Sequence, residues 1–192
     1  MACGKSHVAT YFRNFGGHVI EADDLGREVM TPDGEAYGGV VQKFGYDVLA
    51  EDGTIDRAKL AELVFRDPAA LARLNAVVHP AVRRRALFQL EKAAAKDPHG
   101  VAIYVAAILL ESNAMQEIDK LIVVTCTPEQ QMERALRRPG ATPENVAARL
   151  SRQMPPQEKL SHADYVIDAS GAPEDTERQT KIVYEELRKL AA

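Results

Sequence analysis

The alternation of short apolar, β-branched runs with stretches of helical periodicity is the feature that most constrains how this chain can fold. Three runs, at residues 101–105, 121–124 and 165–167, have the length and composition of buried parallel strands. A fourth run, at residues 18–21, ends in acidic side chains. Helical segments separate these runs, and the alternation predicts an α/β fold around a parallel sheet.

The long segment between the first and second of the expected strands predicts a helical insertion. About 70 residues is too many for a simple crossover, whose loops run about 2–6 residues around one helix. Asp67 followed by Pro68 marks a helix start, and we expect separate helices on either side of His79 and Pro80. We therefore place a helical subdomain at residues 31–99.

A second helical feature is an arginine-rich hairpin at residues 128–159. Thr127 and Gln130 match a capping box, which predicts a helix as far as about Arg138. A Pro-Gly pair then breaks this helix, and Thr142, followed by proline, starts another. Both helices carry arginines, so we expect a compact and mobile hairpin.

Two further helices are expected to flank the sheet, one near each end of the chain. Apolar residues between Val8 and Phe15 recur at helical spacing before a Gly-Gly stop, and residues 173–190 form one amphipathic pattern. We expect a single domain over residues 1–192. Its core comprises residues 1–30, 100–127 and 160–192, beside the helical insertion and the hairpin.

Composition argues against a protein that coats nucleic acid. The formal net charge is -4 and the pI is about 5.8, whereas duplex binding depends on neutralising many phosphates with Lys and Arg. Basic residues do cluster at residues 83–85 and 134–138. Such clusters suit a small polyphosphorylated ligand as well as they would suit a nucleic acid.

Cys3 and Cys126 show no metal-type spacing and no disulfide framework, which favours a reducing compartment. No apolar run approaches the length of about 20 residues that crosses a bilayer. The first residues lack the apolar segment of a signal peptide. We therefore expect a soluble, cytoplasmic protein without a membrane partner.

Gly4, Lys5 and Ser6 directly precede an amphipathic helix, as in a phosphate-binding loop. There the backbone N–H groups and the helix N-terminus cradle phosphates, the lysine reaches the β- and γ-phosphates, and the hydroxyl binds Mg²⁺. The full motif needs a glycine five residues before Gly4, at a position that would precede Met1. We therefore expect a chain without the first strand and the first half of the loop. The expected ATP-binding residues are Ala2, Cys3, Gly4, Lys5, Ser6 and His7.

Acidic residues follow the first expected strand, at Glu21, Asp23 and Asp24. In open parallel sheets ligands bind outside the carboxyl ends of the strands, so these side chains are expected to face the phosphate loop. A carboxylate there can accept the proton of an attacking hydroxyl and help to hold Mg²⁺. The simpler alternative is that Asp23 or Asp24 caps the helix that follows.

Together these segments resemble the dephospho-CoA kinase family in order and spacing, over nearly the whole chain. The matching segments are Gly4-Lys5-Ser6, Val19-Ile20-Glu21-Ala22-Asp23 with Arg27, His79-Pro80, the arginine-bearing hairpin, and Ala163-Asp164-Tyr165-Val166-Ile167-Asp168 with Ser170-Gly171. The resemblance implies a P-loop kinase-like parallel sheet flanked by helices. It also implies that the helical insertion binds the CoA moiety and that the hairpin is a lid over ATP.

The resemblance also implies roles for single residues. Asp23 falls on the catalytic carboxylate that activates the ribose 3′-hydroxyl, and Lys5 and Arg138 are expected to stabilise the transferring phosphate. Ser6 is the expected Mg²⁺ ligand. For Arg134, a solvated surface charge is an equal alternative to a lid role. The expected substrate-binding residues are Glu21, Arg27, His79 and Glu111.

Three positions depart from the family pattern. Glu21 stands where an aspartate is usual, one methylene longer. The family often reads D-x-P-L-L-F-E on its next strand, whereas this chain has Val105 at the acidic position, lacks the proline, and keeps the final glutamate as Glu111. Ala169 replaces a residue that is often polar, so adenine recognition there would depend on backbone groups.

The expected function is ATP-dependent phosphorylation of the 3′-hydroxyl of dephospho-CoA, the last step of CoA biosynthesis, with Mg²⁺ as cofactor. The expected partners are ATP and dephospho-CoA, without nucleic acid, for a monomer or weak homo-oligomer. Two alternatives stay open. One is a catalytically impaired nucleotide- or CoA-binding protein, and the other is a P-loop kinase for another small metabolite.

Overall fold

The computed structural model describes residues 2–107, 109–110, 118–151 and 153–192. These residues form two compact units. One unit comprises Met1–Val19 and Asp97–Ala192, and the other comprises Ile20–Lys96. The second unit is therefore one continuous stretch of chain, whereas the first is assembled from both ends.

The first unit carries the parallel strand pair. Its principal elements are α1 (Lys5–Asn14), β2 (Ala102–Val105), β3 (Ile122–Thr125), β4 (Tyr165–Asp168) and α9 (Pro173–Leu190). Strands β3 and β4 run parallel, with Ile122 opposite Tyr165 and Thr125 opposite Asp168. Strand β1 (His18–Glu21) is the neighbour of β2 in a second two-stranded sheet. It begins where the His18 N–H donates to the Val101 carbonyl at 2.8 Å.

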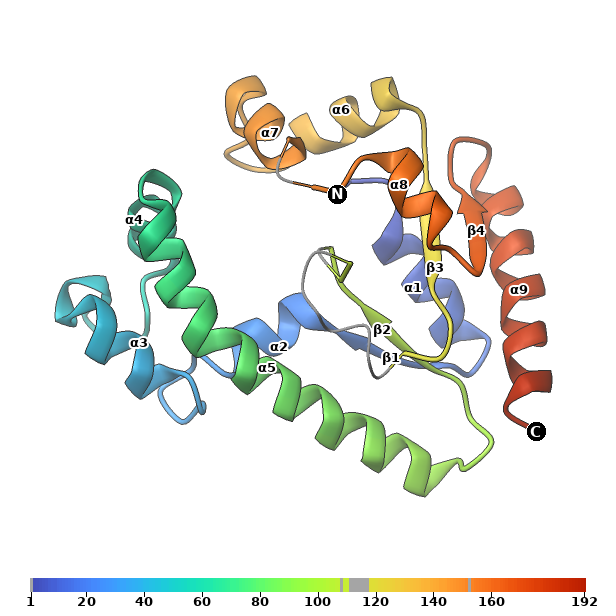
Figure 1. The fold of residues 1–192 in the computed structure, drawn as a ribbon, viewed down its shortest axis with the longest axis horizontal. Coiled ribbons are helices and arrows are strands. Elements are labelled where there is room, and N and C mark those ends of the chain that lie inside the picture. Colours follow the sequence, from blue (N-terminus) through green and yellow to red (C-terminus); the bar gives the residue numbers. More distant parts are fainter. Residues whose placement is uncertain (1, 108, 111–117, 152) are drawn as a thin grey trace. The chain divides into compact units, whose positions relative to one another are not determined.

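Helices α1 and α9 pack together beside β4 in this unit (Figure 1). Their shared core contains Phe12, which is 1% exposed, together with Val8, Ile167 and Val183. Side chains of β2 and β3 pack against the same cluster. Because helices thus cover apolar, β-branched strands, the prediction of an α/β fold with parallel strands is confirmed.

The expected hairpin is also present, as α6 (Pro128–Leu136) and α7 (Pro143–Leu150), followed by α8 (Pro156–Ser161). The capping box is complete, since the Gln130 N–H donates to Thr127 Oγ1 at 3.2 Å and the Thr127 N–H donates to Gln130 Oε1 at 3.3 Å. After α6 the chain turns through Gly140, whose φ is 70°. The Ala141 N–H closes this turn on the Arg138 carbonyl at 3.1 Å.

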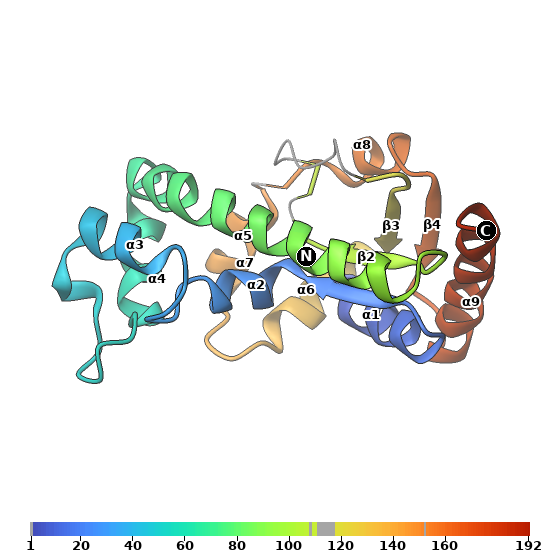
Figure 2. The same ribbon diagram turned by 90° about the horizontal axis from the view of Figure 1, so that it is seen from below.

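The second unit is almost wholly helical. Its elements are α2 (Ala22–Glu28), α3 (Tyr37–Phe44), the 3₁₀ turn η1 (Tyr46–Val48), α4 (Arg57–Arg66) and α5 (Pro68–Lys96). Helices α3 and α4 pack beside the first half of α5, as both views show (Figures 1 and 2). Val40, Val48 and Leu60 are buried in the core that they share. Helices α3, α4 and α5 lie within residues 31–99, where the sequence predicts a helical subdomain, and the role of this subdomain as an insertion stays a prediction.

The expected break at His79 and Pro80 is wrong, because α5 continues through Pro80 as a single helix. Proline lacks an N–H, so the turn loses the bond to the Ala76 carbonyl. The helix persists because α2, α3 and α4 all pack against it, and Ala70 and Ala81 on it are fully buried. Within the described part of the chain no helix, α5 included, has the length and apolar character to cross a membrane.

Two adjacent glycines in α3 predict opposite effects on stability. A Cβ at Gly39 would lie 2.7 Å from Val77 Cγ1, whereas a Cβ at Gly38 would meet nothing within 4 Å. We expect Gly39→Ala to lower the free energy of unfolding by about 1–3 kcal/mol, because it overpacks the contact between α3 and α5. Gly38→Ala is expected to raise it by about 0.5 kcal/mol, because alanine restricts the unfolded chain. Urea denaturation of both variants measures the difference, and equal effects would contradict the packing.

Candidate active site

The phosphate-binding segment begins at Gly4, which takes a backbone conformation that suits glycine. Its φ is 90°, and its carbonyl accepts the N–H groups of His7 at 2.9 Å and Val8 at 3.1 Å, so α1 starts at Lys5. The side chain of Ser6 is exposed at this helix end. Exposed N–H groups at a helix N-terminus bind anions, so the local geometry suits a phosphate.

The residues before Gly4 are held by the hairpin. Ala2 is 9% exposed and packs with Ala135 of α6 and Val146 of α7. The thiol of Cys3 lies within hydrogen-bonding reach of Cys126, which directly follows β3. Burial, and then the contact with Cys3, raises the pKa of the Cys126 thiol to about 12. Cys126 is therefore an uncharged thiol at neutral pH.

Arg134 ties the hairpin to the segment that follows β4. Its Nη2 donates to the Ala169 carbonyl at 3.0 Å, and Gln130 Nε2, one turn earlier, donates to the Ser170 carbonyl at 2.8 Å. A Cβ at Gly4 would lie 3.2 Å from the Ala169 Cβ. The sequence left Arg134 between a lid role and a solvated charge, and the structure shows its guanidinium bound to the Ala169 carbonyl.

The backbone donors at Ala169 and Ser170 are engaged inside the protein. The Ala169 N–H donates to the Thr125 carbonyl at 2.9 Å, and the Ser170 N–H donates to Asp168 Oδ1 at 2.9 Å. Of the backbone groups of Ala169 and Ser170, an adenine base could therefore use only the carbonyl oxygens, each of which has two lone pairs. The use of backbone groups for adenine stays a prediction.

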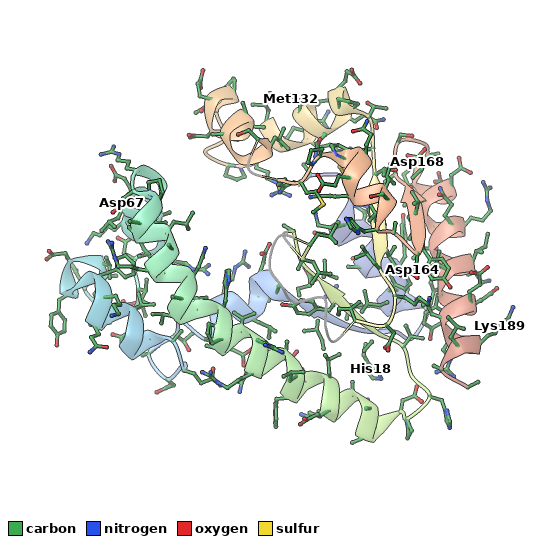
Figure 3. All side chains as sticks on the ribbon, viewed as in Figure 1. His18, Asp67, Met132, Asp164, Asp168 and Lys189 are labelled. Carbon is green, nitrogen blue, oxygen red and sulfur yellow. The ribbon has the colours of Figure 1, made fainter. Side chains whose placement is uncertain are left out.

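The two aspartates of the Asp-Tyr-Val-Ile-Asp segment lie at opposite ends of β4 (Figure 3). Asp164 accepts the Leu121 N–H at 2.8 Å and Lys120 Nζ at 2.9 Å. These two hydrogen bonds hold the pKa of the Asp164 carboxyl below its usual range. The carboxylates thus fix the start of β3 and the turn after β4, a role that the sequence did not indicate.

Arg138 occupies the first corner of the turn that ends α6, and its side chain is exposed. Its neighbour Arg137 donates to Glu133 Oε1 at 2.5 Å. No hydrogen bond or ion pair engages the Arg138 guanidinium among the residues that the structure describes. Its planar, bidentate donor group therefore suits a phosphate.

The acidic residues belong to the second unit, at the start of α2. The N-cap position is occupied by Glu21, and no side chain caps this helix, so neither Asp23 nor Asp24 acts as its cap. Asp24 Oδ1 accepts Arg27 Nη1 at 3.3 Å, with both side chains largely exposed. The Asp23 carboxylate is exposed in the first helical turn. The capping alternative is therefore wrong, and Asp23 has the accessibility that a proton acceptor needs.

His79 lies on an exposed face of α5, in the same unit as Asp23. Glu111 lies outside the described residues. Over the described ranges, no group of three or more His, Cys, Asp or Glu side chains is arranged to hold a metal ion. Mg²⁺ in kinases takes one or two protein oxygens and otherwise water and substrate phosphates, so the exposed Ser6 hydroxyl fits that requirement.

A family model described as dephospho-CoA kinase matches residues 1–175. The chain belongs to the dephospho-CoA kinase family. A dephospho-CoA kinase from Aquifex aeolicus is 40% identical over 189 residues, covering 98% of this chain and 94% of the relative. One from Geobacter sulfurreducens is 37% identical, covering 96% and 93%.

Solved structures agree with this family at the level of the fold. The crystal structure of TT1252 from Thermus thermophilus has a TM-score of 0.80 at 32% identity, covering 97% of this chain and 93% of the other. The dephospho-CoA kinase from Campylobacter jejuni has a TM-score of 0.65 at 24% identity, covering 98% and 94%. At 24% identity, the similarity to the Campylobacter jejuni structure shows only that the fold is shared.

The raised pKa of Cys126 predicts slow alkylation. Iodoacetamide attacks the thiolate, so at pH 8.5 folded Cys126 is expected to react at least about a hundredfold more slowly than in urea. The alkylation rate of folded Cys126 should keep rising above pH 9, the ordinary pKa of a thiol, toward pH about 12. Because the unfolded chain releases this proton first, the shift favours the folded state below pH 9 and is lost as pH rises above it.

Mass spectrometry of the Cys126 peptide measures these rates. The matched control is Cys3→Ser, which removes the neighbouring thiol but leaves the burial, so most of the suppression should remain. A folded rate that levels off near pH 9 would contradict the shift.

Proposed function

We propose that the chain transfers the γ-phosphoryl group of ATP to the ribose 3′-hydroxyl of dephospho-CoA, giving CoA and ADP. The observation that carries the proposal is the Gly-Lys-Ser segment at the start of α1, in a chain that belongs to the dephospho-CoA kinase family over residues 1–175. A helix N-terminus with a following lysine and hydroxyl provides the groups that a nucleoside triphosphate requires.

The first unit supplies the residues proposed for ATP. Backbone N–H groups at residues 4–6 would donate hydrogen bonds to phosphate oxygens, and Lys5 would neutralise the charge that develops on the transferring group. Arg138 would grip the same group through two of its N–H donors. The accessible guanidinium of Arg138 and the positive φ of Gly4 support these roles.

The second unit supplies the residues proposed for the acceptor. The Asp23 carboxylate would accept the 3′-hydroxyl proton as the oxygen attacks phosphorus. Arg27 is placed to contribute positive charge, with Asp24 orienting its guanidinium. Glu21 and His79 would contact the CoA moiety, and so would Glu111, which is not part of this unit; these roles rest on the family resemblance.

Mg²⁺ is proposed as the cofactor, held on the protein side by the Ser6 hydroxyl. When bound, it would offset the negative charge of the phosphate oxygens. The proton transfer to Asp23 and the orientation by Lys5 and Arg138 are contributions of the chain itself.

The test is CoA formation from dephospho-CoA by the purified chain with ATP and Mg²⁺. Adenosine and AMP, which carry the same nucleoside, serve as matched acceptors. We expect phosphorylation of dephospho-CoA alone, and none in the presence of EDTA. Calorimetric binding of dephospho-CoA without turnover would instead indicate a catalytically impaired binding protein. Phosphorylation of another acceptor would indicate a different metabolite kinase.

Asp23→Asn tests the proposed proton acceptor. We expect kcat to fall about 10²–10⁴-fold with little change in either KM, because the carboxylate acts mainly in the transition state. The matched control is Asp24→Asn. Asp24 is the next residue in the chain, and its carboxylate already forms an ion pair with Arg27. Steady-state kinetics of both variants decide between them. A near-normal Asp23→Asn beside a severely impaired Asp24→Asn would move the role to Asp24.

A further inference from the structure

Helix α2 is short for the task proposed for it: its first turn follows strand β1 directly, and its last turn packs on α5. It has seven residues, Ala22–Glu28, with the exposed Asp23 in its first turn. Leu25 and the following Val29 are buried, and Val29 packs with Ala81 of α5. These apolar contacts hold the middle and the end of the helix, beyond its acidic first turn.

An ion pair joins the same end of α2 to α5. Arg85 Nε donates to Glu28 Oε1 at 2.9 Å, and Arg85 Nη2 reaches the same oxygen. The two side chains are 37% and 42% exposed. Arg85 lies one turn after Ala81, on the helix face that receives Val29. The ionic and apolar contacts are therefore neighbours on one face of α5.

The geometry makes the direction of α2 sensitive to this attachment. Asp23 and Glu28 are five residues apart, about 7.5 Å along a helix axis. A tilt of about 10° at the Glu28 end therefore moves Asp23 by about 1 Å. Displacements of that size at a reacting group can cost about a hundredfold in rate. The Asp24–Arg27 pair cannot prevent such a tilt, since both of its members lie on α2.

We propose that Arg85 is a positioning residue, which holds Glu28 and thereby fixes the direction of α2 and of the Asp23 carboxylate relative to α5. This role rests on the proposed function, in which Asp23 accepts the proton. His79, which is proposed to bind dephospho-CoA, also lies on α5. In this proposal α5 therefore fixes the positions of both His79 and the Asp23 carboxylate. Arg85 itself touches neither substrate in this proposal.

The competing interpretation is an exposed ion pair that only stabilises the fold, and such pairs contribute little. The chain offers a matched control in Arg188, whose Nη1 lies 3.2 Å from Asp97 Oδ2, with side chains 42% and 41% exposed. This pair also joins distant parts of the sequence, but it involves neither α2 nor α5. Arg85→Gln and Arg188→Gln therefore remove ion pairs of similar exposure.

In the assay for CoA formation, we expect Arg85→Gln to lower kcat about tenfold, with the KM for ATP within about twofold of its original value. Arg188→Gln should leave both kcat and the KM for ATP unchanged. Exchanging the charges in Glu28→Arg with Arg85→Glu should recover most of the kcat that either single reversal loses. If Arg85→Gln does not fold, Arg85→Lys is the second variant. It keeps the positive charge but loses the planar guanidinium, so kcat should fall by an intermediate factor.

Hydrogen exchange of the unliganded protein separates this proposal from the proposed function. Amides of residues 22–28 should exchange faster in Arg85→Gln than in the original chain, and should be unchanged in Arg188→Gln. Unchanged exchange there overturns the proposal, whether or not the original chain makes CoA. Normal kcat in Arg85→Gln, with an active original chain, also overturns it. Absence of CoA formation by the original chain, together with faster exchange, removes the proposed function and leaves the anchoring of α2 supported.

Discussion

The close approach of the phosphate-binding segment to the turn after β4 is the contact on which the first unit depends. Gly4 has no side chain, and a Cβ there would lie 3.2 Å from that of Ala169. Arg134 holds the Ala169 carbonyl on the other side, while Ala2 packs among residues of α6 and α7. Three distant segments of the chain thus fix the backbone from which Lys5 and Ser6 project.

The second unit follows a different principle, in which one long helix supports several short ones. Helix α5 receives α2, α3 and α4 along its length, and its smallest residues, such as Ala70 and Ala81, are fully buried at these contacts. Small side chains let helix backbones approach closely, as at Gly39 against Val77. The acidic turn of α2 is therefore held by a scaffold that is continuous in sequence.

Local sequence signals predicted most of the elements because their causes are local. The capping box at Thr127 and the proline starts of α7 and α9 lie within the segments that they define. Predictions failed where contacts with residues distant in the sequence determine the local structure. Helix α5 passes through Pro80 because tertiary packing outweighs one lost hydrogen bond. The structural roles of Arg134 and Asp164 depend on residues 35 and 43 positions away, which no local pattern reveals.

The discontinuity of the first unit has a consequence for how the chain folds during synthesis. Residues 20–96 can form their helical core as soon as they leave the ribosome, because that unit is contiguous. Val8 and Phe12 must wait for Ile167 and Val183, which are made last. At about 5–20 residues per second, the roughly 170 residues from Phe12 to Val183 take about 9–34 seconds to make. During this interval the apolar face of α1 has no core to enter, so the nascent chain is expected to need chaperone protection until Ile167 and Val183 have emerged from the ribosome.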